Sequence, residues 1–551
     1  MVMLETKLSR LQELIGKKLS SKELGENLSL MGFEVESVDG DEVKVDLTPD
    51  RPDLLSTHGL ARALKSYLGI KPGLQDYHVE NSSVTVNVDA SARKVRPYTA
   101  CAVVKGLSFD DEKIEEIIWV QEKMHDTFAR GRKKAAIGIY PLEKIKPPIK
   151  YYAEDPKKLK FRPLESEEEM TGEEVLEKHP AGKAYRHLLE GHKKYPVFSD
   201  STGKILSMPP IINSHDLGKV TQSTKDVFIE VSGHDLRTLQ EFLNILVTLL
   251  YDMGGQVCSV QVKYPKEYET GNIKTPHLKP SEMRLQPKHV NDVLGTRLTY
   301  EEVAFFLKKM GHGVVNANSK QVKVLVPAYR ADVLHAADLV DDVMRGLTMD
   351  KLKPELPNHA TVGGVLRESV TSDQFRELMT GHGYQEVFTL ALTNAEDQYK
   401  KMLSAENPHV TIPKAKAEGL NSVRTWLTPE LLKVLASNRH KQFPQKVFDA
   451  DQAVIPDEKE DVKSRNALKF SALSSHAKAN YSEAKSVLES VCKAFNWKLE
   501  VLEEELPWCL NGRGAKIRVN GLTGWLGELH PRVLENFNLA NPVAGFEFEV
   551  E

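Results

Sequence analysis

LIGKKLSSKELGENLSLMGFEV, residues 14–35, has a counterpart later in the chain, VLGTRLTYEEVAFFLKKMGHGV, residues 293–314. The two stretches belong to an internal repeat in which residues 14–68 align without a gap to residues 293–347, at a constant offset of 279. A unit of about 55 residues is too small to bury a large core by itself. We therefore expect each copy to pack against a neighbouring part of the chain.

Both copies carry the signals of the same local structure. Ser20 and Thr299 stand three residues before Glu23 and Glu302, which is the spacing of a capping box at the start of a helix. An apolar helical stripe follows, and Met-Gly at 31–32 and at 310–311 predicts a C-terminal cap. The segments EVKVDL and QVKVLVP then predict a strand, and a second helix should follow at 56–68 and 335–347.

The second helix is where the copies differ. Three aspartates of the second copy, Asp338, Asp341 and Asp342, replace Gly59, Arg62 and Ala63 of the first. Their spacing places all three on one helix face, and Asp332 lies just upstream. Carboxylates this close repel unless a cation intervenes, and oxygen ligands with room for water favour Mg²⁺ over Ca²⁺. The alternative is a solvated acidic surface that Arg330 and Arg345 neutralise.

Length and composition predict a multidomain α+β protein. The chain has 551 residues, 40% hydrophobic and 28% charged, which is ordinary for three or four globular domains. We expect the small α+β units to flank a central domain, with a C-terminal antiparallel sheet that includes a hairpin about Asn520-Gly521. The predicted boundaries are 1–90 for the first copy, 91–265 for the central domain, 270–350 for the second copy and 351–551 for the C-terminal domain.

Several classes of protein are disfavoured. A net charge of −4 excludes a basic field over the whole molecule, so any nucleic-acid contact must be local. Four scattered cysteines show no metal-ligand spacing and suit a reducing compartment. No apolar run reaches the length of a membrane span, and the N-terminus does not read as a secretory signal, so we expect a cytoplasmic protein. Phosphate loops, dinucleotide fingerprints and nucleophile elbows are missing, which predicts no self-contained active site.

An ordered set of segments resembles the β subunits of phenylalanine–tRNA ligases of the archaeal and eukaryotic type. The segments are DRPDLLSTHGLARALKSYLG (50–69), RPYTACAVVKGL (96–107), AAIGIYPLEKIKPPIKYYAEDP (135–156), ILSMPPIINS (205–214), TKDVFIEVSGHD (224–235), YRADVLHAADLVDDVMRG (329–346) and GELHPRVLENF (527–537). Each is moderately specific alone, and their common order across nearly the whole chain is highly specific.

The resemblance implies an α2β2 tetramer, EC 6.1.1.20, in which the α subunit makes Phe-AMP from ATP and transfers Phe to tRNA(Phe). The C-terminal domain would be a class II synthetase-like core without catalysis, and residues 362–551 indeed lack a G-x-G-x-G-x-E-R-like segment. The family's Mg²⁺ site would fall on Asp332, Asp338, Asp341 and Asp342.

The resemblance also implies that the central domain hydrolyses Tyr wrongly attached to the tRNA. A hydrophobic pocket rejects an added hydroxyl only about a hundredfold, so a second pocket that binds the hydroxyl is needed. The candidates are Phe198 for the ring and Ser207, Glu230 and Ser232 for polar contacts. For the last two, the alternative is simple alternation on a half-exposed strand, VFIEVSG.

Two other functions compete with that of a ligase subunit. A stand-alone deacylase would act on mischarged tRNA without a partner, although it would not need the long C-terminal domain. A tRNA-binding assembly scaffold would have lost editing, since Glu230 and Ser232 stand where the family more often has Asp and Thr.

Overall fold

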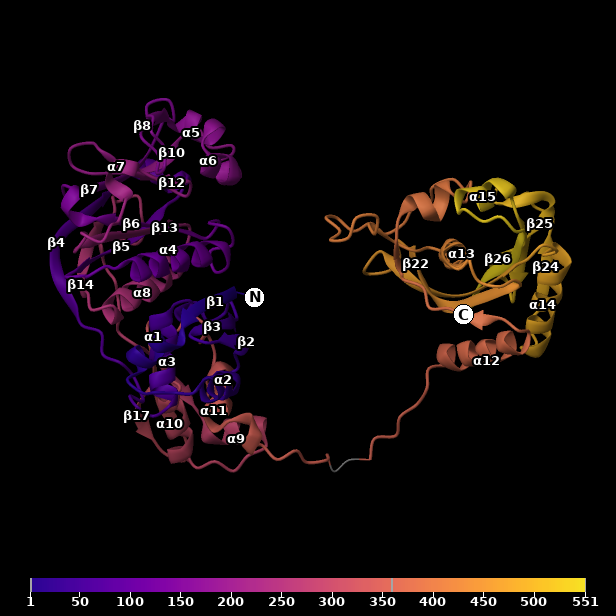
Figure 1. Cartoon of the computed structure of the whole chain (residues 1–551), viewed down its shortest axis with the longest axis horizontal. Coiled ribbons are helices and arrows are strands. Elements are labelled where there is room, and N and C mark those ends of the chain that lie inside the picture. The colour runs from indigo at the N-terminus through magenta and orange to yellow at the C-terminus, as the bar shows by residue number, and fades with distance from the viewer. Residues whose placement is uncertain (1, 358–359, 551) are drawn as a thin grey trace. The chain divides into compact units, whose positions relative to one another are not determined.

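The chain divides after Leu356 into two compact units, within the proline-containing segment 351–361. The computed structural model describes residues 2–357 and 360–550. Among these residues, no helix combines the length and the apolarity that crossing a bilayer requires. The two units are described separately below (Figure 1).

The first unit contains both repeat copies, each with a three-stranded sheet. The first copy consists of β1 (Val2–Lys7), α1 (Leu8–Ile15), α2 (Ser21–Leu30), β2 (Glu34–Asp39), β3 (Glu42–Leu47), the short 3-10 turn η1 (Pro52–Leu54) and α3 (Thr57–Tyr67). The second copy consists of β16 (Ser281–Leu285), α9 (Pro287–Leu294), α10 (Tyr300–Lys309), β17 (Gly313–Ala317), β18 (Val322–Val326) and α11 (Ala336–Leu347). The strand orders are β1-β3-β2 and β16-β18-β17.

The two copies agree residue by residue, which confirms the predicted repeat. Leu4 pairs with Val45 in one sheet, and Met283 pairs with Val324 in the other, at the same offset of 279. A register shift follows Val35 in the first copy and Val314 in the second. Both predicted capping boxes form. The repeat therefore begins with the strands at β1 and β16, upstream of the segment that sequence similarity marks.

The copies pack against each other through equivalent positions. Arg345 Nη1 donates to the carbonyl of Met31 at 2.6 Å, and Ser66 Oγ, at the equivalent position of the first copy, donates to the carbonyl of Lys308 at 3.0 Å. Gly32 has φ +90°, and a Cβ atom there would lie 1.9 Å from Arg345 Nη1. Glycine at this helix end thus permits both the left-handed turn and the close approach of the second copy.

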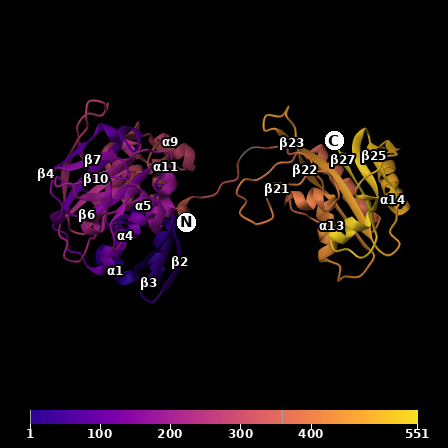
Figure 2. The ribbon, with the colours of Figure 1, turned by 90° about the horizontal axis from the view of Figure 1, so that it is seen from above.

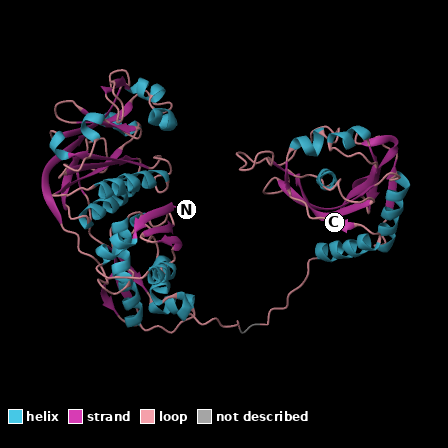
Figure 3. Cartoon of the chain, in the orientation of Figure 1, coloured by secondary structure: helices cyan, strands magenta, loops and turns pink. Residues whose placement is uncertain are grey.

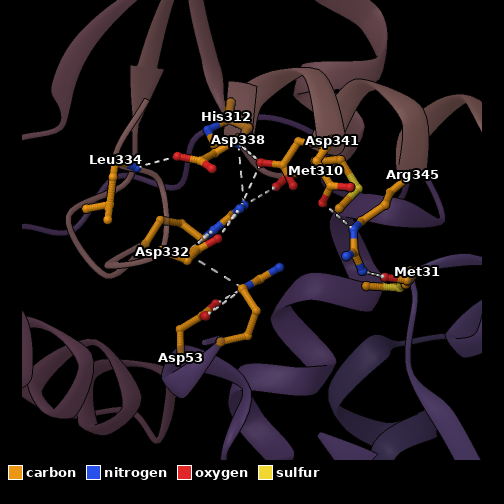
Figure 4. Close-up of polar contacts among 12 residues, drawn as sticks. Met31, Asp53, Met310, His312, Asp332, Leu334, Asp338, Asp341 and Arg345 are labelled. Carbon is orange, nitrogen blue, oxygen red and sulfur yellow. Dashed lines mark hydrogen bonds and ion pairs between the residues drawn. The ribbon is translucent and has the colours of Figure 1, made fainter. Parts of the chain in front are cut away.

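A buried ion network occupies the junction between the copies (Figure 4). Arg51 forms a bidentate pair with Asp53, at 2.9 Å for both bonds, and the equivalent Arg330 forms one with Asp332, at 2.8 and 2.7 Å. Arg330 also donates to Asp342 at 2.7 Å. Arg51 lies 3.9 Å from Asp332, so the two copies of the Arg-x-Asp motif meet across the junction.

A ten-stranded sheet lies between the two copies in the sequence. Its strands are β4 (Val79–Val88), β5 (Tyr98–Lys105), β6 (Ala135–Pro141), β7 (Ile149–Glu154), β10 (Tyr195–Ser199), β11 (Ile205–Met208), β12 (Ile212–Asn213), β13 (Val227–Gly233), β14 (Gln256–Lys263) and β15 (Ile273–Thr275). The order is β12-β11-β10-β7-β4-β14-β5-β13-β6, with β15 on β14. The predicted boundaries at 90 and 265 need correction, because β4 and β15 find their hydrogen-bond partners in this sheet.

Two helices, α4 (Asp111–Asp126) and α8 (Leu236–Asp252), cover one face of this sheet (Figure 1). Asp235 caps α8 by accepting from Thr238 N at 2.9 Å. Smaller elements connect the strands: η2 (Ala90–Lys94), η3 (Leu142–Lys144), β8 (Lys160–Phe161), β9 (Met170–Thr171), α5 (Gly172–Lys178), α6 (Pro180–Tyr185), η4 (Arg186–Leu188) and α7 (His215–Gly218), and η5 (Met349–Lys351) follows α11. The sheet ends at β6, beside α4.

The second unit is a seven-stranded, largely antiparallel sheet with helices on both faces (Figures 2 and 3). The sheet consists of β19 (Gln385–Glu386), β22 (Gln445–Pro456), β23 (Ser464–Ser475), β27 (Val543–Val550), β26 (Leu522–Leu529), β25 (Cys509–Val519) and β24 (Leu499–Leu502). One face packs against α12 (Arg367–Gly381) and α14 (Tyr481–Ala494), and the other against α13 (Thr428–Ser437) and α15 (Pro531–Asn536). A separate ribbon pairs β20 (Leu392–Thr393) with β21 (Ser422–Val423), and a π-helical turn spans η6 (Glu396–Lys400).

The predicted hairpin about Asn520-Gly521 joins β25 to β26 and is confirmed. Both central residues have positive φ, 48° and 87°, as a two-residue turn of the primed type requires.

Two neighbouring aspartates of α11 provide a test of the buried junction. The side chain of Asp342 is 3% exposed and bound to Arg330, whereas that of Asp341 is 47% exposed and paired with Arg345. We expect Asp342→Asn to lower the free energy of unfolding by about 3 kcal/mol, because it leaves a buried guanidinium undercompensated. Asp341→Asn should cost less than about 1 kcal/mol, as for other exposed pairs. Urea denaturation of both variants measures the difference, and equal costs would contradict the network.

Candidate polar pocket in the central domain

Glu230 lies at the centre of β13, a strand on which every residue is buried. Its neighbours in the sheet are β5 on one side and β6 on the other, and Cys101 and Gly138 are its cross-strand partners. The alternative of a half-exposed strand is therefore wrong, because the two faces of β13 meet two different buried layers. A carboxyl group at such a position needs polar partners, since burying it alone is costly.

Hydroxyl groups from two other strands supply those partners. Tyr140 OH donates to Glu230 Oε1 at 3.1 Å, and Ser207 Oγ donates to the same oxygen at 3.3 Å. Tyr140 OH also lies 3.2 Å from Asn213 Oδ1. Gly138 makes room for the group, because a Cβ atom there would lie 2.1 Å from Tyr140 OH and 2.6 Å from Glu230 Oε1.

The second carboxyl oxygen of Glu230, Oε2, is buried and has no hydrogen-bond partner in the part of the chain that the structure describes. Burial raises the pKa of Glu230 to about 8, against the opposing effects of the Tyr140 hydroxyl and the Arg96 charge. A buried carboxyl with one satisfied and one free oxygen can bind a hydroxyl group from outside. This is the most distinctive chemical feature of the central domain.

Glu230 contributes to the wall of a cavity of about 1080 Å³ beside the edge strand β6. One part of the wall is apolar and comes from α4 and β6: Ile114, Ile117, Ile118, Ile137 and Ile139. Polar and charged groups are numerous in the same wall and include Gln121, Glu122, His125, Arg132, Glu165, Glu168, Lys178, His179, Asn213 and His215. The volume is close to the upper end of the range of small-molecule sites.

His125 and Arg132, two residues of the cavity wall, carry buried nitrogen donors. His125 Nε2 accepts from the backbone N–H of Ile137 at 2.8 Å, so the ring proton is on Nδ1, which is buried and without a partner among the described residues. Burial lowers the pKa of His125 well below its ordinary value, with help from the charges of Arg132 and Arg96, so the ring is neutral. Arg132 Nε is likewise buried and unpartnered there, while its Nη1 binds the carbonyls of Pro210 and Ile211.

The four predicted editing residues therefore separate into two pairs. Ser207 and Glu230 are in direct contact, and Glu230 reaches the cavity. Phe198 is fully buried and stacks on Tyr151 with ring centroids 4.3 Å apart, and it does not line the cavity that the described residues form. Ser232 accepts from Arg96 Nε at 3.1 Å and also lies outside that wall. Phe198 and Ser232 support the strands and do not offer a surface to a ligand in this arrangement.

Sequence reasoning missed Tyr140, Asn213 and His125. Tyr140 and Asn213 lie in two of the segments that resemble the family, AAIGIY and ILSMPPIINS. Gly138, in the first of these segments, was an available signal, because it lies opposite Glu230 in the sheet. His125 gave no signal, because a lone histidine near the end of a charged helix is unremarkable until the edge of a strand is placed beside it.

The four aspartates of the predicted Mg²⁺ site do not converge (Figure 4). Asp332 and Asp342 bind Arg330, and Asp342 also contacts His312 Nε2 at 2.6 Å. Asp341 binds Arg345 at 2.7 Å. Asp338 accepts from the backbone N–H groups of Leu334 and His335, at 2.7 Å each, and caps α11.

Protein donors contact each of the four carboxylates in this arrangement. The described residues contain no cluster of three or more acidic, histidine or cysteine side chains arranged to hold a metal ion. Although burial raises the pKa of Asp342, the Arg330 charge and the His312 contact outweigh it, and the pKa lies well below the usual range. In this arrangement each of the four carboxylates has a cationic or backbone partner, and the predicted Mg²⁺ site at these residues stays a prediction.

Two family models and many individual proteins match this chain. The family model described as the phenylalanyl tRNA synthetase beta chain CLM domain matches residues 352–550, and that of the tRNA synthetase B5 domain matches residues 283–347. The chain is 38% identical over 558 residues to the phenylalanine–tRNA ligase beta subunit of Thermococcus kodakarensis, which covers 98% of this chain and 96% of that protein. The chain belongs to the phenylalanine–tRNA ligase beta subunit family.

Other members of the phenylalanine–tRNA ligase beta subunit family give the same result. The subunit of Methanothrix thermoacetophila is 37% identical, with 98% of both chains covered. The crystal structure of an N-terminal fragment of the phenylalanyl-tRNA synthetase beta subunit from Pyrococcus horikoshii has a TM-score of 0.60 and 40% identity, and covers 63% of this chain and 99% of that fragment. The B5 match coincides with the second repeat copy, and the CLM match covers nearly all of the second unit.

The raised pKa of Glu230 predicts a pH-dependent stability. The folded chain holds this proton up to about pH 8, whereas the unfolded chain loses it near the ordinary value of 4.5. The folded state therefore binds more protons between these values, and its stability falls as the pH rises, by at most about 1.4 kcal/mol per pH unit. Glu230→Gln lacks this loss, so its stability relative to the wild type should rise from pH 5 to pH 8. Parallel urea midpoints over this range would contradict the shift.

The cap at Asp338 predicts the effect of removing that carboxylate. Asp338→Ala should lower the free energy of unfolding by about 1 kcal/mol, the usual cost of a lost helix cap. Ser56→Ala is the matched control, since Ser56 Oγ accepts from Gly59 N at the start of the equivalent helix α3, at 2.9 Å. Mg²⁺ should leave the melting temperatures of both variants and of the wild type unchanged. A rise in the wild type that Asp338→Ala abolishes would instead show that the aspartates gather around the ion.

Proposed function

We propose that this chain is the non-synthetic subunit of a phenylalanine–tRNA ligase that also proofreads its product. As a family member it is a subunit of the enzyme class EC 6.1.1.20. In the proposal it joins an α subunit in an α2β2 tetramer. The α subunit supplies the ATP-dependent chemistry and charges tRNA(Phe) with Phe. The central domain then hydrolyses Tyr-tRNA(Phe).

The observation that carries the proofreading proposal is Glu230, a residue of the cavity wall whose Oε2 is buried and has no hydrogen-bond partner among the described residues. A tyrosine side chain in the cavity can place its hydroxyl against this oxygen. A phenylalanine side chain has no group for it and leaves the buried carboxyl unsatisfied. A site built to bind a hydroxyl discriminates strongly against the ligand that lacks one, because the unpaired polar group is costly.

The donors of the same wall suit an ester substrate. Hydrolysis of an aminoacyl ester develops negative charge on its carbonyl oxygen, and fixed donors in a water-poor site stabilise that charge. His125 Nδ1–H and Arg132 Nε–H are buried donors without partners among the described residues. The neutral state of His125 keeps its donor in place over a wide pH range, because its pKa lies far below neutrality.

Two features of the second unit support a role beside a catalytic partner. Phe388, Leu390 and Leu392 lie on one segment and are 87%, 63% and 41% exposed; of the residues between them, Thr389 is 6% exposed and Ala391 is exposed. Such an apolar row is typical of a surface that another chain covers. Arg424 is fully buried and directs its donors to Thr389, Asp451 and the carbonyl of Gln452, so it is not free to bind phosphate.

We place this work in the cytoplasm, where the four buried, unpaired cysteines fit a reducing environment. A stand-alone deacylase would act without the partner that the apolar row of the second unit supports. A scaffold without editing would not need the free oxygen of Glu230. The departures at Glu230 and Ser232 are the observation on which the scaffold alternative rests.

Reconstitution tests the division of labour. Aminoacylation with Phe, ATP and tRNA(Phe) is measured with this chain alone, with a matching α chain alone and with both. We expect charging only in the mixture, and deacylation of Tyr-tRNA(Phe) by the mixture to exceed that of Phe-tRNA(Phe). Formation of Phe-AMP by the single chain would refute the proposed role in charging. Equal hydrolysis of the two esters would refute proofreading, and selective hydrolysis without co-purification of the partner would favour the deacylase.

A further inference from the structure

Tyr140 is fully buried, and its hydroxyl contacts Glu230. It comes from β6, directly beside β13, and reaches Glu230 Oε1 over the space left by Gly138. Tyr140 does not itself line the cavity formed by the described residues, whereas Glu230 and Asn213 do. The phenol therefore contacts the carboxyl from behind the wall.

We propose that Tyr140 is a positioning residue that, together with Ser207, fixes Oε1 of Glu230 and so presents Oε2 to the hydroxyl of a bound tyrosyl ester. The proposal rests on the proofreading function proposed above. It assigns the selection of tyrosine to a pair of residues, a carboxyl that touches the substrate and a phenol that orients it.

The geometry explains why the free oxygen is Oε2. Oε1 already accepts from two hydroxyl groups, Tyr140 at 3.1 Å and Ser207 at 3.3 Å. These two bonds use both lone pairs of Oε1, so a proton on the carboxyl group is held by Oε2. In the charged state Oε2 accepts from the substrate hydroxyl, and in the protonated state it donates to it. In both states Oε2 of Glu230 offers the tyrosine hydroxyl a hydrogen bond that phenylalanine cannot make.

The local structure holds Tyr140 in this place. The single proton of the phenol can be donated to Glu230 Oε1 at 3.1 Å or to Asn213 Oδ1 at 3.2 Å, so these two acceptors hold the hydroxyl between β13 and β12. Any side chain at residue 138 would displace both the phenol and the carboxyl, because its Cβ atom would lie within 2.6 Å of Glu230 Oε1. Burial raises the pKa of Tyr140 well above its ordinary value, so its hydroxyl remains a donor throughout the physiological range.

The electrostatic effect of Tyr140 on Glu230 has a definite sign. The charge of Arg96 lowers the pKa of Glu230, Cys101 lies across from it on β5, and the buried Tyr151 is near enough for its own pKa to be raised by Glu230. The ionisable residues that line the cavity are Glu122, His125, Arg132, Glu165, Glu167, Glu168, Lys178, His179, His215 and Lys219. The Tyr140 hydrogen bond also lowers the pKa of Glu230, and burial opposes it. Removing the hydroxyl therefore moves the titration of Glu230 to higher pH.

The test compares Tyr140→Phe with the wild type in the reconstituted ligase. The change removes one oxygen atom, and we expect kcat/KM for Tyr-tRNA(Phe) hydrolysis to fall about tenfold, the effect of one hydrogen bond to an ionisable group. Hydrolysis of Phe-tRNA(Phe) should not fall, so the selectivity drops by the same factor. Tyr264→Phe is the matched control, because Tyr264 is also buried and its hydroxyl bonds to Thr99 at 2.8 Å.

A second measurement separates positioning from a structural defect. The carboxyl carbon of Glu230, followed by ¹³C NMR, should titrate near pH 8 in the wild type and at higher pH in Tyr140→Phe. A structural defect would lower all activities and the melting temperature without moving this midpoint. An unchanged selectivity together with an unchanged midpoint would overturn the proposal. If the wild type hydrolyses neither ester, proofreading fails, and an unmoved midpoint would then independently refute the coupling of Tyr140 to Glu230.

Discussion

The first unit is held together by two arginine–aspartate pairs that come from equivalent positions of a repeat. Arg51 with Asp53 and Arg330 with Asp332 meet across a buried junction, although about half the chain separates them in sequence. Removing either partner of such a pair would leave an uncompensated charge in the interior, so all members must remain together. The junction brings both ends of the central domain to one place and thereby closes the unit around the ten-stranded sheet.

The two copies use the same scaffold for different purposes. In the first copy, α3 packs its His58 against Glu116 of α4 and its Arg62 against Asp252 of α8, so this copy fastens the junction to the central domain. In the second copy the equivalent positions are Ala337 and Asp341, and the helix faces outward there. Asp342 replaces Ala63 and extends the ion network to His312. The acidic residues that look like a metal site are thus shared among a network, a cap and a surface pair.

The polar pocket depends on the same principle: a buried ionisable group needs hydrogen-bond partners from the surrounding fold. Glu230 is tolerated in the middle of a buried strand because two hydroxyl groups reach one of its oxygens. The other oxygen is buried without a partner among the described residues, and Glu230, His125 and Arg132 all line the same cavity. A closed sheet without the edge at β6 would have no room for such a cavity, so the site follows from where the sheet ends.

The sequence alone determined the repeat, its capping boxes and one strand of each copy, the hairpin at Asn520-Gly521 and the membership of the family. These features depend on local spacing, which a chain displays directly, and on motifs in a fixed order. It also pointed to Ser207 and Glu230, but not to their partner Tyr140, and it grouped four aspartates that the structure separates. Only the tertiary structure decided these points, because helical spacing gives the face on which a carboxylate lies but not the arginine, backbone N–H or hydroxyl that approaches it from a distant segment.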